Sequence, residues 1–139
     1  MKKTSYVILA SLILALSSCE KSPVWEKYAG QWTVSDNQSS DNCLGGINNY
    51  NINILQEGNQ DNKIRVYNFA GLWQNAYVSM SIDEDGKTLS MQEQDVMDVY
   101  GDVWNVQLIE GEIANENLIK LKYRLADFCV IYGDAVLTR

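Results

Sequence analysis

The feature that most constrains this chain is a two-residue alternation of apolar and polar side chains. It is clearest where apolar residues alternate with basic ones, at Ile119, Leu121, Tyr123 and Leu125 against Lys120, Lys122 and Arg124. Successive side chains of a β-strand point to opposite faces, so this pattern predicts a strand with one buried face. No long helical pattern appears after residue 28. We therefore predict an all-β domain.

Similar alternation recurs at intervals along the chain and predicts eight strands. We expect them at 31–35, 50–54, 64–67, 76–82, 88–94, 104–108, 119–125 and 129–138, with a tight hairpin turn at 83–86 and a polar loop at 36–49. Short links between strands favour an antiparallel meander, which fits a sandwich or a closed barrel. Closure removes exposed edges and places the first strand beside the last. The prediction is an eight-stranded antiparallel up-and-down β-barrel.

The N-terminus has the form of an export signal. Lys2 and Lys3 precede an apolar run at 6–16, and Leu16-Ser17-Ser18-Cys19 ends it. Such a run is too short to span a bilayer as a helix of the mature protein. One interpretation is an ordinary signal peptide in which Cys19 occurs by chance.

The end of this signal resembles the lipobox of bacterial lipoproteins. The resemblance implies that residues 1–18 are removed and that Cys19 becomes a lipidated N-terminus, anchored to the membrane by its acyl chains. Residues 19–27 would then be a tether and 28–139 the barrel domain. Within the tether, Ser22 and Pro23 suggest a single helical turn, with Ser22 as its cap and Pro23 at its first position.

The charge of the mature protein excludes some partners. The chain has 11 basic and 18 acidic residues. Removing Lys2 and Lys3 with the signal leaves 9 basic and 18 acidic residues, a net charge of −9. An acidic domain does not bind nucleic acid by phosphate attraction, and it does not lie on anionic lipid unaided. A basic protein partner remains compatible with this charge.

Cys43 and Cys129 remain as a pair after lipidation of Cys19. Disulfides persist in exported domains, so we predict that these two residues are bonded. Two cysteines without any histidine do not make a zinc site, and a redox pair more often has C-x-x-C spacing.

The segment Gly30-Gln31-Trp32 resembles the G-x-W motif in the first strand of lipocalins and their calycin relatives. In that superfamily the tryptophan lies across one end of the barrel, and an arginine from the last strand packs on its ring. The resemblance implies these roles for Trp32 and for Arg139, the final residue.

The layout also resembles small calycin-like lipoproteins of the Bacteroidota. The shared features are the short helix, the segment Tyr28-Ala29-Gly30-Gln31-Trp32-Thr33-Val34 and the corner Asn68-Phe69-Ala70-Gly71-Leu72. The short strands and the lack of a helix after the barrel depart from ligand-carrying lipocalins.

We expect no enzymatic activity, no cofactor and no metal. The chain has no histidine, which removes the commonest general base and metal ligand. Asp95, Asp98 and Asp102 leave a weak calcium site or a paired-carboxylate enzyme as minor alternatives.

Four aromatic residues are candidates for ligand binding at the barrel mouth: Trp73, Tyr77, Tyr100 and Trp104. Aromatic side chains at strand ends can stack on a small apolar ligand or a glycan, and the alternative is that they cap the core. We expect a lipoprotein of the bacterial envelope, in the outer membrane on either face, that binds such a ligand. The alternative is an inhibitor or interaction protein for an enzyme such as lysozyme or a protease.

Overall fold

The computed structural model describes residues 21–43 and 45–139. The predicted signal at 1–18 and Cys19 lie outside these residues. The described chain is almost entirely β, with two short 3-10 helices. The elements in chain order are η1 (Val24–Lys27), β1 (Gly30–Asp41), β2 (Gly46–Gln56), β3 (Lys63–Tyr67), η2 (Phe69–Gly71), β4 (Tyr77–Ile82), β5 (Leu89–Ser90), β6 (Gln94–Met97), β7 (Val103–Asn115), β8 (Leu118–Ala126) and β9 (Val130–Thr138).

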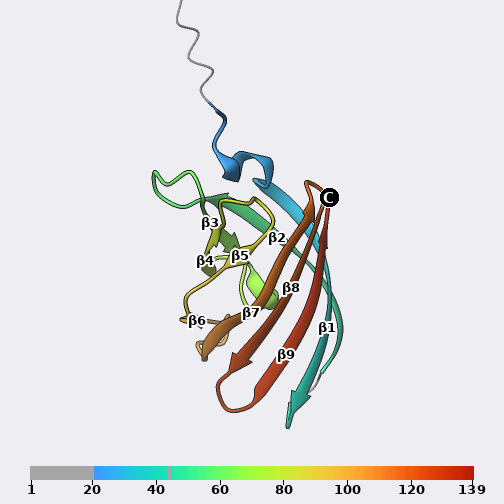
Figure 1. Cartoon of the computed structure of the whole chain (residues 1–139). Helices are drawn as coiled ribbons and strands as arrows, with labels where there is room; N and C mark the ends of the chain where they lie inside the picture. Colours follow the sequence, from blue (N-terminus) through green and yellow to red (C-terminus); the bar gives the residue numbers. More distant parts are fainter. Residues whose placement is uncertain (1–20, 44) are drawn as a thin grey trace, which may run out of the picture.

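All the strands belong to one antiparallel sheet. Their order is β5-β4-β3-β2-β1-β9-β8-β7-β6, so the first and last strands are neighbours, as the sequence predicts. The sheet curls strongly on itself, and the C-terminus lies at the same end as η1 (Figure 1). We call this the tether end, and we call the opposite end, where β1 stops and β9 starts, the disulfide end.

The strand count and several boundaries differ from the prediction. The sheet has nine strands rather than eight, because the predicted strand at 88–94 is divided between β5 and β6. The predicted loop at 36–49 is wrong: β1 continues to Asp41, and β2 begins at Gly46. At the N-terminus, Pro23 is the N-cap of η1, and no side chain caps the helix, so Ser22 does not have the predicted role.

The concave face of the sheet holds the core. Along β1 the buried residues are Trp32, Val34 and Asp36, and their neighbours on the strand are exposed. The other strands alternate in the same way, so the buried side chains meet inside the curl. The large apolar side chains supply the main stabilisation of the fold.

The two edges of the sheet meet along a short seam. Thr88 forms an isolated antiparallel bridge with Glu112, and the Ile113 amide donates to the Lys87 carbonyl at 2.7 Å. Gly111 permits this approach, because a Cβ there would lie 2.7 Å from the Leu89 Cβ.

Farther along the seam, the side chain of Gln94 makes hydrogen bonds to the backbone of β4 that a neighbouring strand would otherwise make. The Gln94 amide accepts from the Ser79 N–H at 2.9 Å and donates to the Ser79 carbonyl at 3.0 Å. This pair of bonds copies the exchange between two peptide groups in an antiparallel ladder.

Candidate functional site

The tether end is held by contacts between the first strand region and the last residue. The Arg139 guanidinium lies 4.8 Å from the centre of the Trp32 ring, and its nitrogens donate to the carbonyls of Ala29, at 3.1 Å, and Lys27. The Trp32 indole N–H donates to the Tyr28 carbonyl at 2.8 Å. The side chain of Trp32 is fully buried. The Trp32 and Arg139 side chains therefore pack together at this end.

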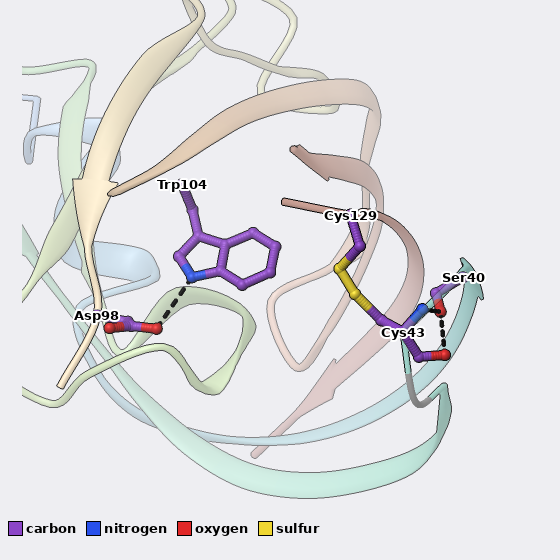
Figure 2. Close-up of a disulfide and its surroundings, with 5 residues drawn as sticks. All are labelled: Ser40, Cys43, Asp98, Trp104 and Cys129. Carbon is purple, nitrogen blue, oxygen red and sulfur yellow. Dashed lines mark hydrogen bonds between the residues drawn. A yellow bond between two sulfur atoms is a disulfide. The ribbon is translucent and has the colours of Figure 1, made fainter. Parts of the chain in front are cut away.

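The disulfide end is joined by the predicted bond between Cys43 and Cys129, which the structure confirms. The two Cα atoms are 6.0 Å apart, and 86 residues separate them in sequence. Cys43 follows β1 and Cys129 precedes β9, so the bond reinforces the pairing of the first and last strands. Ser40 fixes the cysteine loop, because its hydroxyl accepts from the Cys43 N–H at 3.0 Å and donates to the Cys43 carbonyl (Figure 2).

Trp104 lies inside this end and is held by Asp98. Its indole N–H donates to the Asp98 carboxylate at 3.0 Å (Figure 2). The same carboxylate accepts from the backbone amides of Tyr100, at 2.8 Å, and Asp102, at 3.0 Å. Burial of the Asp98 carboxyl raises its pKa, but these hydrogen bonds outweigh burial and the net pKa is lowered. Asp98 therefore organises the β6–β7 turn.

This geometry does not support the alternative of a weak calcium site. Asp98 is occupied by its own turn, and the Asp95 carboxylate accepts from the Asn105 amide at 3.1 Å. Within residues 21–43 and 45–139, no group of three or more acidic or cysteine side chains is placed to hold a metal ion. In the same part of the chain, no helix has the length and apolar character needed to cross a membrane.

The structure separates the four predicted ligand-binding aromatics. Trp104 is only 6% exposed and is part of the core, whereas Tyr100 projects from the β6–β7 turn with 88% of its surface exposed. Tyr77 lies on the convex face of β4, where its ring is 5.2 Å from that of Tyr67. Trp73 lies in the segment between η2 and β4. The structure does not place these residues around one mouth.

Exposed apolar side chains instead gather on the two turns of the disulfide end. Phe128, in the β8–β9 turn, is 73% exposed, and its ring centre lies 5.3 Å from that of Trp104. We call this group the mouth surface: Met97, Val99, Tyr100, Val103 and Phe128. Phe128 belongs to it although no sequence pattern singled it out. Its position beside Cys129 was the available signal, because the disulfide fixes that turn at this end.

A buried polar network lies deeper in the concave face. Asp36 is completely buried, and one oxygen of its carboxylate accepts from the hydroxyls of Tyr123 and Tyr50, the latter at 2.9 Å, and from the Gln38 amide at 3.0 Å. Gln38 also donates to the Tyr123 hydroxyl at 2.9 Å and accepts from Asn48 at 2.8 Å. All the groups that donate to the carboxylate are neutral.

The network perturbs both tyrosines. Burial, followed by the nearby Asp36 charge, raises the pKa of Tyr123; burial, followed by Tyr123 and Asp36, raises that of Tyr50. Each hydroxyl therefore stays protonated and able to donate to the carboxylate. Hydrogen bonds to a charged group contribute about 1.5–3 kcal/mol each. They reduce the cost of burying a carboxylate without a cation, while the other carboxylate oxygen, Oδ1, is buried with no hydrogen-bond partner among the described residues.

Gly133 makes room for this network. It pairs with Tyr123 across β8 and β9, and the tyrosine ring covers it. A Cβ at Gly133 would lie 2.5 Å from the Tyr123 hydroxyl oxygen and nearer still to two ring carbons. Gly133 is therefore a site of close packing within a regular strand pair.

Comparisons with known proteins do not assign this chain to a family. No family model matches the sequence, and no curated protein matches it. Among solved structures, a redesigned β-barrel is similar, with a TM-score of 0.49 and 10% sequence identity over 84% of this chain and 95% of that chain. A likeness at this level carries no argument, so the fold assignment rests on the strand pairing.

Proposed function

We propose that this chain is a lipid-anchored, non-enzymatic binding protein of the bacterial envelope, with a calycin-like barrel. We further propose that the mouth surface binds a protein partner. The observation that carries this proposal is the gathering of exposed apolar side chains at the end opposite the tether. Aromatic side chains such as Tyr100 and Phe128 often dominate binding energy at protein interfaces.

The charges at this end specify a basic partner. The segments 36–43, 45–49, 94–103 and 126–135 form the disulfide end and contain no lysine or arginine. Five exposed carboxylates lie in them: Asp41, Asp95, Asp102, Asp127 and Asp134. An apolar centre with an acidic border is complementary to a basic protein, and the attraction raises the association rate at low salt. A basic enzyme such as a lysozyme has this character, which supports an inhibitor role.

Two features support a non-enzymatic role. The carboxylate of Asp36 is sealed in the core and cannot touch a substrate. The carboxylate of Asp98 accepts from two backbone amides of its own turn and from the indole N–H of Trp104 on β7.

The test uses a basic lysozyme as the probe. Binding of the full mature domain is measured by biolayer interferometry at low and high salt, together with lysozyme activity. We expect binding that weakens with salt and is lost in the double variant Tyr100→Ser, Phe128→Ser. The matched control is Tyr132→Ser, because Tyr132 is an exposed tyrosine on β9 outside the mouth surface. Equal binding by the double variant would contradict the assignment of the surface.

A small apolar ligand is the second candidate, and one observation favours it. Phe128 packs beside Trp104, so a flat apolar molecule can stack on an exposed aromatic ring that is itself supported by the core. A neutral fluorescent probe, N-phenyl-1-naphthylamine, tests this candidate. Binding should quench Trp104 emission and disappear in Phe128→Ser. A lack of quenching at saturating probe concentration would rule out the apolar-ligand candidate.

A further inference from the structure

We infer that the convex face of β1, β2 and β3 carries a binding groove for a neutral oligosaccharide. The groove has a volume of about 480 Å³. Its lining is almost entirely amide and aromatic, and consists of Gln31, Asn51, Ile52, Asn53, Tyr67, Asn68 and Gln74. Ligand sites of proteins commonly have volumes of roughly 300–1,000 Å³. This groove lies on the opposite face of the sheet from the Asp36 network.

The strand register aligns the groove residues in a row. Gln31 pairs with Asn53 and Asn53 with Tyr67, so β1, β2 and β3 each contribute one side chain to the groove. Tyr77, which pairs with Tyr67, extends this row beyond the groove onto β4. Directly opposed side chains of a sheet lie about 5 Å apart, so the row spans roughly 14 Å. A surface of this length suits a chain of sugars better than a single sugar.

The chemistry of the row matches sugar hydroxyls. Each amide offers both a donor and an acceptor, as does each hydroxyl of a sugar. The rings of Tyr67 and Tyr77 are in contact at 5.2 Å and supply the flat apolar faces on which the C–H bonds of a sugar ring can pack. The Arg65 guanidinium lies over the Tyr77 ring, 4.7 Å from its centre, so it packs on one face of that ring.

The groove also has a fixed wall. Asn68 has a left-handed backbone conformation, with φ of 59°, and its side-chain amide donates to the Asn51 carbonyl at 2.8 Å. The Asn68 backbone N–H donates to the Ala76 carbonyl at 3.0 Å, which closes the segment that carries Gln74. A preformed wall reduces the entropy that a ligand must remove on binding.

Two observations select a neutral glycan over other occupants. No lysine, arginine, aspartate or glutamate lines the groove, and the acidic mature domain repels acidic polysaccharides. The strands β1, β2 and β3 are each paired on both sides, so no backbone edge is free to pair with an extended peptide. Recognition must therefore come from side chains, and these are neutral.

The experiment is affinity electrophoresis of the mature domain in gels containing soluble neutral polysaccharides. The panel contains an α-glucan, a β-glucan, a mannan, a xylan, a galactan and an arabinan, with polygalacturonate as the charged comparison. We expect retardation by at least one neutral member, unaffected by salt. Tyr67→Ala and Asn53→Ala should each weaken binding roughly tenfold or more.

The matched controls are Tyr132→Ala and Gln107→Ala, which change an exposed tyrosine and an exposed amide elsewhere on the sheet. Asn53→Ala changes an exposed residue, so it keeps the test valid if Tyr67→Ala fails to fold. Retardation by no neutral member, retardation by polygalacturonate alone, or binding that survives Asn53→Ala would each overturn the inference. The mouth variant Tyr100→Ser, Phe128→Ser should retain glycan binding, which separates this site from the proposed partner surface.

Discussion

The substitution Gly133→Ala tests the packing of the buried network with a single methyl group. The added Cβ must displace the Tyr123 ring, because it would lie 2.5 Å from the hydroxyl oxygen and nearer to two ring carbons. The ring is fully buried and its edge contacts Phe69, with 4.9 Å between ring centres. It therefore cannot move without disturbing its neighbours.

The cost of Gly133→Ala has two parts. Overpacking a dense core typically costs about 1–3 kcal/mol. Moving the Tyr123 hydroxyl away from Asp36 also weakens a hydrogen bond to a buried carboxylate, worth about 1.5–3 kcal/mol. We expect a loss of about 3–5 kcal/mol in the free energy of unfolding. For a domain of this size, that lowers the melting temperature by roughly 10–20 °C.

The assay is urea unfolding followed by tryptophan fluorescence, with thermal denaturation followed by circular dichroism. Gly46→Ala is the matched control, because Gly46 also lies in a strand and a Cβ there meets nothing within 4 Å. We expect the control to change stability by no more than about 0.5 kcal/mol. If Gly133→Ala is equally mild, the packing argument is wrong.

A double-mutant cycle identifies the cause. Tyr123→Leu removes the obstructing ring, so Gly133→Ala should cost much less in that background than in the wild type. We expect a coupling energy of at least about 1 kcal/mol between the two positions. Additive effects would show that the glycine matters for a reason other than Tyr123.

Three further predictions concern pH and the two links between the chain ends. The pKa values of Tyr50 and Tyr123 are raised in the folded protein, so the unfolded chain loses these two protons at lower pH than the folded chain does. The free energy of unfolding should therefore be constant below about pH 10 and fall above it, by up to about 1.4 kcal/mol per pH unit for each tyrosine. Urea unfolding at pH 9 and pH 11 should show this loss of stability. The double variant Tyr50→Phe, Tyr123→Phe should lose less stability between the two pH values. Replacing Cys43 and Cys129 by Ser should lower the free energy of unfolding by about 2–5 kcal/mol, and an unchanged urea midpoint on reduction of the wild type would contradict this. Arg139→Ala should cost about 0.5–2 kcal/mol in urea unfolding, with Arg139→Lys intermediate, and equal stability of all three proteins would argue against the cation–π contact.

The alternating pattern predicted most of the sheet because its inward residues are apolar. Ile52, Ile64 and Val78 are buried on the concave face, as period-two alternation requires. The pairing of the first and last strands was predicted from the meander, and the disulfide was predicted from the expectation that the chain is exported. These are the parts of the fold in which local sequence and tertiary structure agree.

The second half of β1 could not be predicted from hydrophobicity, because its inward residues are polar. The period set by Trp32 and Val34 continues through Asp36, Gln38 and Ser40. Because these residues are polar, the sequence predicts a loop there. Asp36 can be buried only because Tyr123 and Tyr50 come from two other strands to donate to it. These hydrogen bonds form only in the tertiary structure, so the sequence around Asp36 gives no indication of them.

The candidate surfaces were predicted only in part. The aromatic content suggested a binding protein, but periodicity alone does not say which aromatic residues fold inward. Trp104 is inward and buried, whereas Tyr77 is on the convex face beside Tyr67. The amide-lined groove has no sequence motif, since its residues come from three strands and a connecting segment and meet only through the register.

The seam explains both the extra strand and the different character of the two proposed surfaces. β1 and β9 share a continuous ladder and a disulfide. The opposite seam is held by the bridge from Thr88 to Glu112 of β7 and by the hydrogen bonds of the Gln94 side chain to Ser79 of β4. Local opening is easiest where few hydrogen bonds hold the structure. We therefore expect local opening along β6, the strand that leads into the mouth surface, before opening between β1 and β9. The convex groove lies on the continuously paired strands, so its row of side chains is held in a fixed arrangement.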